Sequence, residues 1–265
     1  MVEHADQTAL WSIANQLADA ARTETLSLFR QRSAQATQSK LETFDPVTIA
    51  DRNAEAAMRA IVEKLRPDDG ILGEEFGNKP SKSGLTWVFD PIDGTRGYIS
   101  GTPTWGVLIA LAKDGYPVLG VIDQPYIQER FSGGLGRAQV AGPMGTSQLA
   151  VSTVKSLEEA TLFTTFPEVG TEQEGEAFRR VASKVKLTRY GCDCYAYALL
   201  AAGQIDLVIE AGLFPYDIQA PIAVVEAAGG VVTDWNGEPV HEGGRAVAAA
   251  TPELHQAALS ILNKS

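Results

Sequence analysis

The chain has 265 residues, enough for one large domain or two small ones with a substantial buried core. Its 33 acidic and 22 basic residues give a formal net charge of −11, which disfavours a nucleic-acid or anionic-membrane surface. No apolar run predicts a transmembrane helix, and no signal peptide is evident. The two cysteines, Cys192 and Cys194, are too close for an ordinary disulfide, which favours a reducing, cytoplasmic location.

The first 150 residues predict two helices followed by short strands. Apolar residues at helical spacing indicate helices over 5–32, with a break near Thr23, and over 52–66, closed by Pro67. A hairpin is expected around the turn Asp114-Gly115. The expected strands cover 70–73, 86–90, 106–113, 118–123 and short stretches within 130–152.

From about residue 155, expected strands alternate with helices, the pattern of an α/β unit. We therefore divide the chain into an N-terminal α+β half over 1–150 and a C-terminal α/β half over 151–265. The strands expected in the second half cover 161–165, 187–190, 207–210, 231–233 and 246–249. The helices expected there cover 174–183, 194–202, 218–228 and 252–262.

The most informative motif runs from Asp90 to Thr95 and follows an apolar segment that predicts a buried strand. Asp90, the carbonyl of Ile92 and Asp93 could meet at one point as oxygen ligands for Mg²⁺. Gly94 allows the backbone to approach a ligand, and a helix beginning near Thr95 would offer free amides to an anion. An ordinary Asp-Gly turn is the alternative. The motif favours metal-assisted chemistry on a phosphate.

Three further acidic clusters lie at the ends of expected elements. They contain Asp51, the pair Glu74-Glu75, and Asp217. The three histidines lie away from these clusters, and motifs for serine hydrolases, P-loop NTPases and zinc proteases are absent. A phosphatase without an evident covalent nucleophile is left with metal-activated water.

These motifs together resemble the inositol monophosphatase family of Mg²⁺-dependent, lithium-sensitive phosphatases. The matching segments are Gly73-Glu74-Glu75, the run from Trp87 to Thr95, Tyr216-Asp217, and Gly229-Gly230. The resemblance extends over roughly residues 8 to 262. It implies a layered α+β and α/β sandwich of the inositol monophosphatase/fructose-1,6-bisphosphatase type. It also implies a site between the two halves and a homodimer.

The resemblance also assigns metal ligands. Glu74, Asp90 and the carbonyl of Ile92 would hold a first Mg²⁺ ion. Asp90 would bridge to a second ion, completed by Asp93 and Asp217, and a third would lean on Glu74. Ionised carboxylates crowd together in this way only when cations offset their repulsion.

Other residues would handle water and phosphate. Thr95 would hydrogen-bond the attacking water and Asp51 would orient Thr95, while the amides of Gly94 and Thr95, beside Asp93, would hold the phosphate. Two simpler alternatives are that Asp51 caps the second helix and that Thr95 is only a helix N-cap. Lys40 could lie near the phosphate or be an ordinary solvated lysine.

The second half points to the substrate. Segments 190–201, 215–217 and 94–99 resemble the histidinol-phosphate phosphatase branch of the family. Inositol-specific members usually carry a histidine near the position of Phe214. The resemblance therefore implies L-histidinol phosphate as the small-molecule phosphate ester, with an inositol-type or broad-specificity phosphatase as the alternative. A catalytically silent metal- or phosphate-binding regulator is the alternative outside the enzymes.

Residues on the substrate side fit a cationic ester. Asp193 and Glu210 would pair with an ammonium or imidazolium group through charge-assisted hydrogen bonds. Glu210 is the less diagnostic of the two, because polyol-binding relatives also carry an acid at this position. Asp193 could instead cap the helix at 194–202. Tyr195, Tyr197 and Phe214 could pack an imidazole ring or belong to the core.

Overall fold

The computed structural model describes residues 4–31, 38–39 and 46–264, so Lys40 lies outside the described residues. The helices are α1 (His4–Leu28), α2 (Ile49–Leu65), α3 (Thr95–Ser100), α4 (Glu172–Ala182), α5 (Cys194–Ala201), α6 (Pro215–Ala227), α7 (Pro252–Leu262) and a 3-10 turn η1 (Leu157–Glu159). The strands of the first half are β1 (Gln38–Ser39), β2 (Pro46–Val47), β3 (Gly70–Gly73), β4 (Leu85–Asp93), β5 (Gly106–Lys113), β6 (Tyr116–Gln124), β7 (Glu129–Gly134), β8 (Arg137–Gly142) and β9 (Gly145–Gln148). Those of the second half are β10 (Thr161–Thr164), β11 (Leu187–Tyr190), β12 (Leu207–Leu213), β13 (Val231–Asp234) and β14 (Gly244–Ala249).

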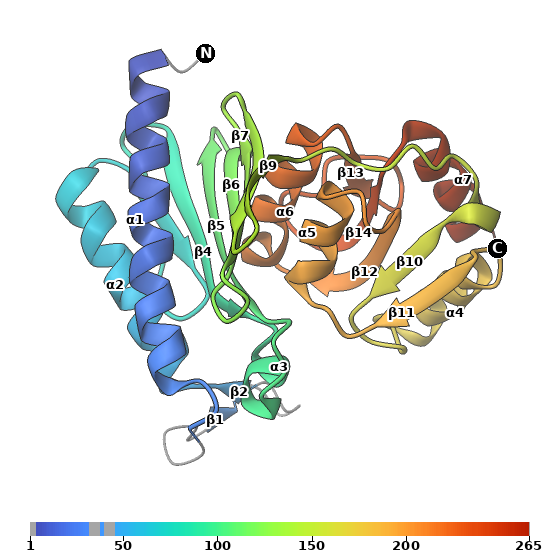
Figure 1. Ribbon diagram of the computed structural model, residues 1–265, viewed down its shortest axis with the longest axis horizontal. Coiled ribbons are helices and arrows are strands. Elements are labelled where there is room, and N and C mark those ends of the chain that lie inside the picture. The colour runs from blue at the N-terminus through green and yellow to red at the C-terminus, as the bar shows by residue number, and fades with distance from the viewer. Residues whose placement is uncertain (1–3, 32–37, 40–45, 265) are drawn as a thin grey trace.

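The elements form five layers, helices and sheets alternating (Figure 1). Helices α1 and α2 cover one face of a seven-stranded sheet of order β3-β4-β5-β6-β7-β8-β9. Helices α5 and α6 lie between this sheet and a five-stranded sheet of order β11-β10-β12-β14-β13. Helices α4 and α7 cover the outer face of the second sheet. The expected layered α+β and α/β sandwich is confirmed.

Three apolar cores hold the layers together. In β4, Trp87 and Phe89 face the α1–α2 core, while Val88 between them faces the central core shared by both sheets. Side chains alternate between the faces of a strand, so an uninterrupted apolar run is what a strand buried on both faces requires. The third core packs α4 and α7, through residues such as Phe178 and Leu259, on the second sheet.

The first helix continues past Thr23, so the expected break there is wrong. Threonine disfavours a helix interior, but here the hydroxyls of Thr23 and Thr25 donate to the carbonyls of Asp19 and Ala21 one turn earlier, at 3.0 and 2.9 Å. The buried face of α1 packs on α2 and the sheet. This tertiary packing outweighs the local preference.

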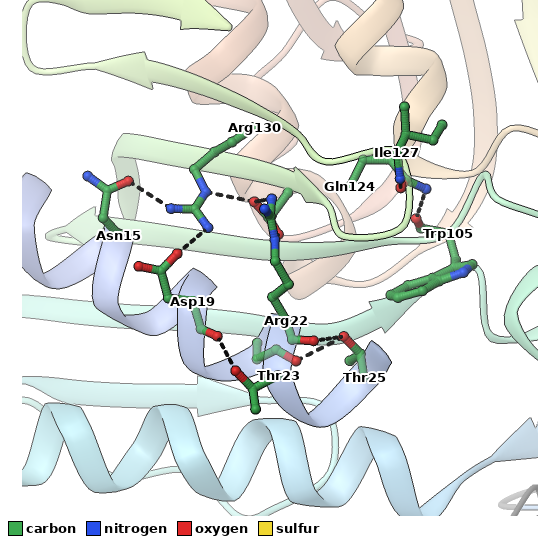
Figure 2. A network of polar contacts seen from close by, with 11 residues as sticks. Asn15, Asp19, Arg22, Thr23, Thr25, Trp105, Gln124, Ile127 and Arg130 are labelled. Atoms are coloured by element: carbon green, nitrogen blue, oxygen red, sulfur yellow. Dashed lines mark hydrogen bonds and ion pairs between the residues drawn. The ribbon is translucent and has the colours of Figure 1, made fainter. Parts of the chain in front are cut away.

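A charged network fastens α1 to the sheet (Figure 2). The carboxylate of Asp123 on β6 is fully buried and accepts hydrogen bonds from Arg22 at 2.6 and 3.0 Å and from Arg130 at 2.6 Å. Arg130 also donates to Asp19 at 2.7 Å and to Asn15 at 3.2 Å. A buried carboxylate needs such partners, and here they come from one helix and one neighbouring strand.

The two sheets use separate parts of the chain, residues 70–148 and 161–249. The expected boundary near residue 150 falls between them. The division into two folding units stays a prediction, because the central core draws side chains from both sheets. Within the described ranges, no helix is long and apolar enough to cross a membrane.

Candidate active site

The candidate site lies where parallel strands from both sheets end. Strands β3 and β4 run parallel, and so do β11, β10 and β12. Ligands characteristically bind beyond the carboxyl ends of such strands. There the structure has a cavity of about 260 Å³. It is lined by Glu74, Asp90, Ile92, Asp93, Gly94, Thr95, Arg96, Thr165, Phe166, Asp193, Glu210, Ala211, Gly212, Leu213, Phe214, Tyr216 and Asp217.

A β-bulge brings Asp90 and Asp93 together. Asp90 pairs with Leu108 of β5 and Asp93 with Gly106, so three steps along β4 match two steps along β5. Residues three apart on a regular strand face opposite sides, and the extra residue of a bulge restores a common side. Backbone amides then fix both carboxylates. Asp90 accepts from the amide of Ile92 at 2.9 Å, and Asp93 accepts from the amide of Cys194 at 2.5 Å.

The start of α6 supplies the third carboxylate. Pro215 occupies the first helical turn, and Asp217 accepts a hydrogen bond from the amide of Phe214 at 2.7 Å. This contact turns the Asp217 carboxylate toward β4. One oxygen each from Asp90, Asp93 and Asp217 lies within 4.8 Å of the others.

The charge of this cluster calls for a cation. Burial, together with repulsion from Asp217, raises the pKa of Asp93 to about 7. Burial also raises the pKa of Asp217 to about 7 and that of Asp90 well above its ordinary range. Hard oxygen donors at this spacing suit Mg²⁺, which would hold all three groups in the ionised state. The donor set therefore fits a divalent cation.

Glu74 completes the acidic wall from the loop after β3. Its negative charge and a hydrogen bond between the two side chains help to raise the pKa of Asp90. The neighbouring Glu75 points away from the cavity, toward Arg52 of α2 at 3.8 Å, and its side chain is buried. The two glutamates therefore have different surroundings, and only Glu74 lines the cavity.

Gly94 and Thr95 line the cavity beside the acidic cluster. Among the described residues, no hydrogen bond joins Asp51 to Thr95. Gly94 is the N-cap of α3 with φ of 84°, and a Cβ there would lie 2.6 Å from Cγ of Asp193. Thr95 follows the N-cap, so the N-cap alternative for Thr95 is wrong. Its hydroxyl donates to the carbonyl of Ile92 at 3.1 Å.

Asp51 instead closes a capping box at the start of α2. Its carboxylate accepts from the amide and hydroxyl of Thr48 at 2.8 and 2.5 Å. Asp51 thus takes part in capping α2, but as its third residue and not as its N-cap, because the helix begins at Ile49 and Thr48 is the N-cap. Asp51 lies outside the cavity lining. Burial raises its pKa to about 7, with a smaller contribution from Glu74. Its role in catalysis stays a prediction.

Asp193 stands at the N-cap position of α5 without capping it. Its backbone has φ of 47° and ψ of −141°, and its side chain makes no cap hydrogen bond. The capping interpretation is therefore wrong. The carboxylate lies against Gly94 and lines the cavity. Burial, followed by repulsion from Asp93, raises its pKa to about 7, and the positive charge of Arg96 opposes that shift.

Glu210 is held rigidly in the opposite wall. One of its carboxylate oxygens accepts from both the amide and the hydroxyl of Thr165, each at 2.9 Å. Burial raises the pKa of Glu210 to about 8, and these two hydrogen bonds oppose the shift. Thr165 directly follows β10, and Asp193 comes shortly after the end of β11, so both lie beyond the carboxyl ends of parallel strands.

The aromatic side chains divide between core and cavity. Tyr197 is buried in the central core, and Tyr195 donates its hydroxyl to Glu129 at 2.7 Å, away from the cavity. Neither lines the cavity, so the core alternative holds for both. Phe214 does line it, half exposed and stacked on Tyr216 with ring centroids 5.3 Å apart.

Among the lining residues, Arg96, Thr165 and Phe166 were not predicted from the sequence to be site residues. The guanidinium of Arg96 lies 4.9 Å from the ring centroid of Phe166, at the same cavity. Thr165 was available as the last residue of an expected parallel strand, where ligand-facing groups gather. The pairing of Arg96 with Phe166 joins positions 70 apart in sequence and had no local signal.

Comparison with known proteins identifies the class. The model of the inositol monophosphatase family matches residues 6–265. The chain belongs to this family and is a phosphoric monoester hydrolase. The acidic cluster agrees with the metal dependence of the family.

Particular relatives carry several names. The chain is 42% identical to the Arabidopsis thaliana protein named bifunctional phosphatase IMPL2, chloroplastic, over 95% of this chain and 74% of that protein. It is 38% identical to a histidinol-phosphatase of Mycobacterium tuberculosis, over 82% and 85% of the two chains. An inositol monophosphatase structure from Zymomonas mobilis superposes with a TM-score of 0.83 at 37% identity, over 96% and 97%.

Proposed function

We propose that this protein is a Mg²⁺-dependent phosphatase that converts L-histidinol phosphate and water to L-histidinol and phosphate. The observation that carries the proposal is the position of Asp193 and Glu210. Both carboxylates line the cavity of the Asp90, Asp93 and Asp217 cluster, yet both lie outside that cluster. A cationic leaving group would favour the ionised form of these two acids and pair with them, whereas a neutral polyol offers them no opposite charge.

The cluster of acidic side chains is suited to hold the metal ions of the proposed reaction. Asp90, Asp93 and Asp217, with Glu74 and the carbonyl of Ile92, would hold about two or three Mg²⁺ ions. Bound Mg²⁺ supplies Lewis-acid polarisation of the phosphoryl oxygens and makes water more acidic. The bulge in β4 and the start of α6 hold these ligands in place, which keeps the cost of ordering them low.

The chain itself orients the phosphate and the water. Gly94 brings the start of α3 close to the cluster, where its free amides would face a bound phosphate. The Thr95 hydroxyl donates its hydrogen to the carbonyl of Ile92, and its oxygen can still accept a hydrogen bond. It would therefore accept a hydrogen bond from a water molecule and orient it. Asp51 would act on Thr95 only indirectly, from its position at the start of α2.

The substrate wall offers complementary groups for an imidazole and an ammonium. Thr165 occupies one oxygen of Glu210, which leaves the other oxygen for a ligand. The stacked Phe214 and Tyr216 present an aromatic surface at the same cavity. These contacts support L-histidinol phosphate over a neutral sugar or polyol phosphate.

The names of relatives support both the proposal and its alternative. Histidinol-phosphatases of Mycobacterium tuberculosis and Chlorobaculum parvum are 38% and 36% identical to the chain. An inositol-1-monophosphatase of Mycolicibacterium smegmatis is 33% identical over 97% of the chain. An inositol-type phosphatase with the same catalytic core is thus the second candidate. Lithium sensitivity, a homodimer and a cytoplasmic location stay predictions.

The proposal is tested by phosphate release from a panel of esters with Mg²⁺ present. The panel contains L-histidinol phosphate, inositol 1-phosphate and glycerol phosphate. We expect kcat/KM to favour L-histidinol phosphate by at least about tenfold, the effect of 1.4 kcal/mol. Chelation of Mg²⁺ should abolish release from every ester. Equal use of the three esters would favour the broad-specificity alternative, and full activity in chelator would refute the metal.

A further inference from the structure

Glu55 is a buried carboxylate that the site described above does not use. It lies on α2, four residues after Asp51, and is fully buried. An ionised side chain in the interior costs several kcal/mol unless charged and hydrogen-bonding partners surround it. Its partners here are therefore informative about what it does.

All of these partners lead to the loop that carries Glu74. Glu55 accepts from the amide of Glu75 at 2.7 Å and from the amide of Phe76 at 3.3 Å. It also pairs with Arg59, whose Nε lies 2.7 Å from the same carboxylate. Arg59 in turn donates to the carbonyl of Phe76 at 3.1 Å. Glu55 and Arg59 together thus bind the backbone directly after Glu74.

The contact extends to the residue before Glu74 as well. A Cβ at Gly73 would collide with the carboxylate of Glu55, so the glycine permits the close approach. The loop is therefore fixed on both sides of Glu74. With Glu75 turned toward α2, Glu74 is directed into the cavity.

We propose that Glu55, supported by Arg59, is a positioning residue that holds the Glu74 carboxylate in the geometry required for Mg²⁺. The inference rests on the metal role of Glu74 in the proposed function. Residues that orient metal ligands from behind typically affect metal affinity strongly when they are replaced. A residue with a merely structural role would lower stability and leave metal affinity unchanged.

The test compares Glu55→Gln with two matched variants. Glutamine keeps the size of the side chain but has one acceptor oxygen, so its amino group faces an N–H donor. Asp69→Asn is the structural control, because Asp69 is also buried and paired, with Arg66 at 2.8 Å and Trp87 at 3.1 Å. It precedes β3, at the end of the strand opposite Glu74. Glu74→Gln reports on the metal role itself.

The readouts are Mg²⁺ binding to the substrate-free protein by isothermal titration calorimetry and thermal denaturation in chelator. We expect Glu55→Gln to weaken Mg²⁺ binding by about 10- to 100-fold. Saturating Mg²⁺ should restore most of kcat. Asp69→Asn should lower Tm and bind Mg²⁺ as the wild type does.

Each outcome has a defined reading. Wild-type Mg²⁺ affinity in folded Glu55→Gln, with weakened affinity in Glu74→Gln, refutes the positioning role and leaves the proposed function intact. Unchanged affinity in both variants refutes the metal role of Glu74. If Glu55→Gln does not fold, Arg59→Lys replaces it, because lysine keeps the charge and cannot bind Glu55 and the carbonyl of Phe76 at once as the guanidinium does. Unchanged Mg²⁺ affinity in Arg59→Lys would then overturn the inference.

Discussion

At the scale of single residues, the acids of the cavity divide into two groups by their partners. Asp90, Asp93 and Asp217 repel one another, and each accepts a hydrogen bond from a backbone amide. Asp193 and Glu210 have individual partners, Arg96 nearby and Thr165 in direct contact. This difference supports separate roles, one group for cations and the other for the leaving group.

Asp193→Asn tests the second role. A charge-assisted hydrogen bond to an ammonium is worth about 1.5–3 kcal/mol. The variant should therefore lose about 10- to 150-fold in kcat/KM for L-histidinol phosphate, mainly through KM. Neutral esters should be nearly unaffected, as should every substrate in the control Glu129→Gln, whose carboxylate binds Tyr195 outside the cavity. An equal loss on all esters in steady-state kinetics would show that Asp193 does not select the leaving group.

At the scale of elements, the sequence predicted those features that arise within one segment of the chain, but not those that depend on packing between distant segments. The apolar run of β4, the Asp114-Gly115 hairpin and the proline at the start of α7 are local signals, and the structure confirms all three. The continuation of α1 through Thr23 depends on packing against α2 and the sheet, which no window of sequence contains.

The site shows the same division. The acids of the Asp90–Thr95 motif were identified from their spacing, but the reason this spacing works is a bulge defined against β5. Asp51 was expected to orient Thr95. The hydrogen bonds that its carboxylate accepts in the structure come from Thr48, and the role toward Thr95 stays a prediction. Thr48 lies only three residues before Asp51, so its amide and hydroxyl reach the Asp51 carboxylate in a capping box at the start of α2.

At the scale of the whole molecule, a cluster of raised pKa values links stability to pH and to Mg²⁺. The pKa values of Asp93 and Asp217 are about 7 in the fold, against an ordinary value of 3.8. Without metal, the folded state therefore binds protons more readily than the unfolded state between these values. Stability from these groups is full below about pH 4 and is lost as pH rises through about 7.

Excess Mg²⁺ should reverse that loss, because it binds the ionised carboxylates. We expect the rise in Tm on adding Mg²⁺ to be larger at about pH 8 than at about pH 5.5. Differential scanning calorimetry in Mg²⁺ and in chelator measures both values. Asp217→Asn serves as the control. At about pH 8, Mg²⁺ should raise the Tm of this variant less than it raises the Tm of the wild type. An equal rise at both pH values in the wild type would contradict this assignment of the cluster.

The arrangement of layers explains why the site needs the whole chain. Glu74 and the β4 motif come from the first sheet, while Asp193, Glu210 and Asp217 come from the second sheet and the helices between the sheets. The central core shared by both sheets sets the distance across the cavity. The proposed selection of a cationic ester would therefore be a property of the assembled fold.

The most direct measurement is a crystal structure of the protein with Mg²⁺, phosphate and L-histidinol. We predict phosphate bound at Gly94 and Thr95, beside cations held by Asp90, Asp93 and Asp217. The ammonium or imidazole of L-histidinol should lie about 3 Å from a carboxylate oxygen of Asp193 or Glu210. The proposed function would be contradicted if L-histidinol bound with its ammonium and imidazole both directed to solvent and made no contact with Asp193 or Glu210.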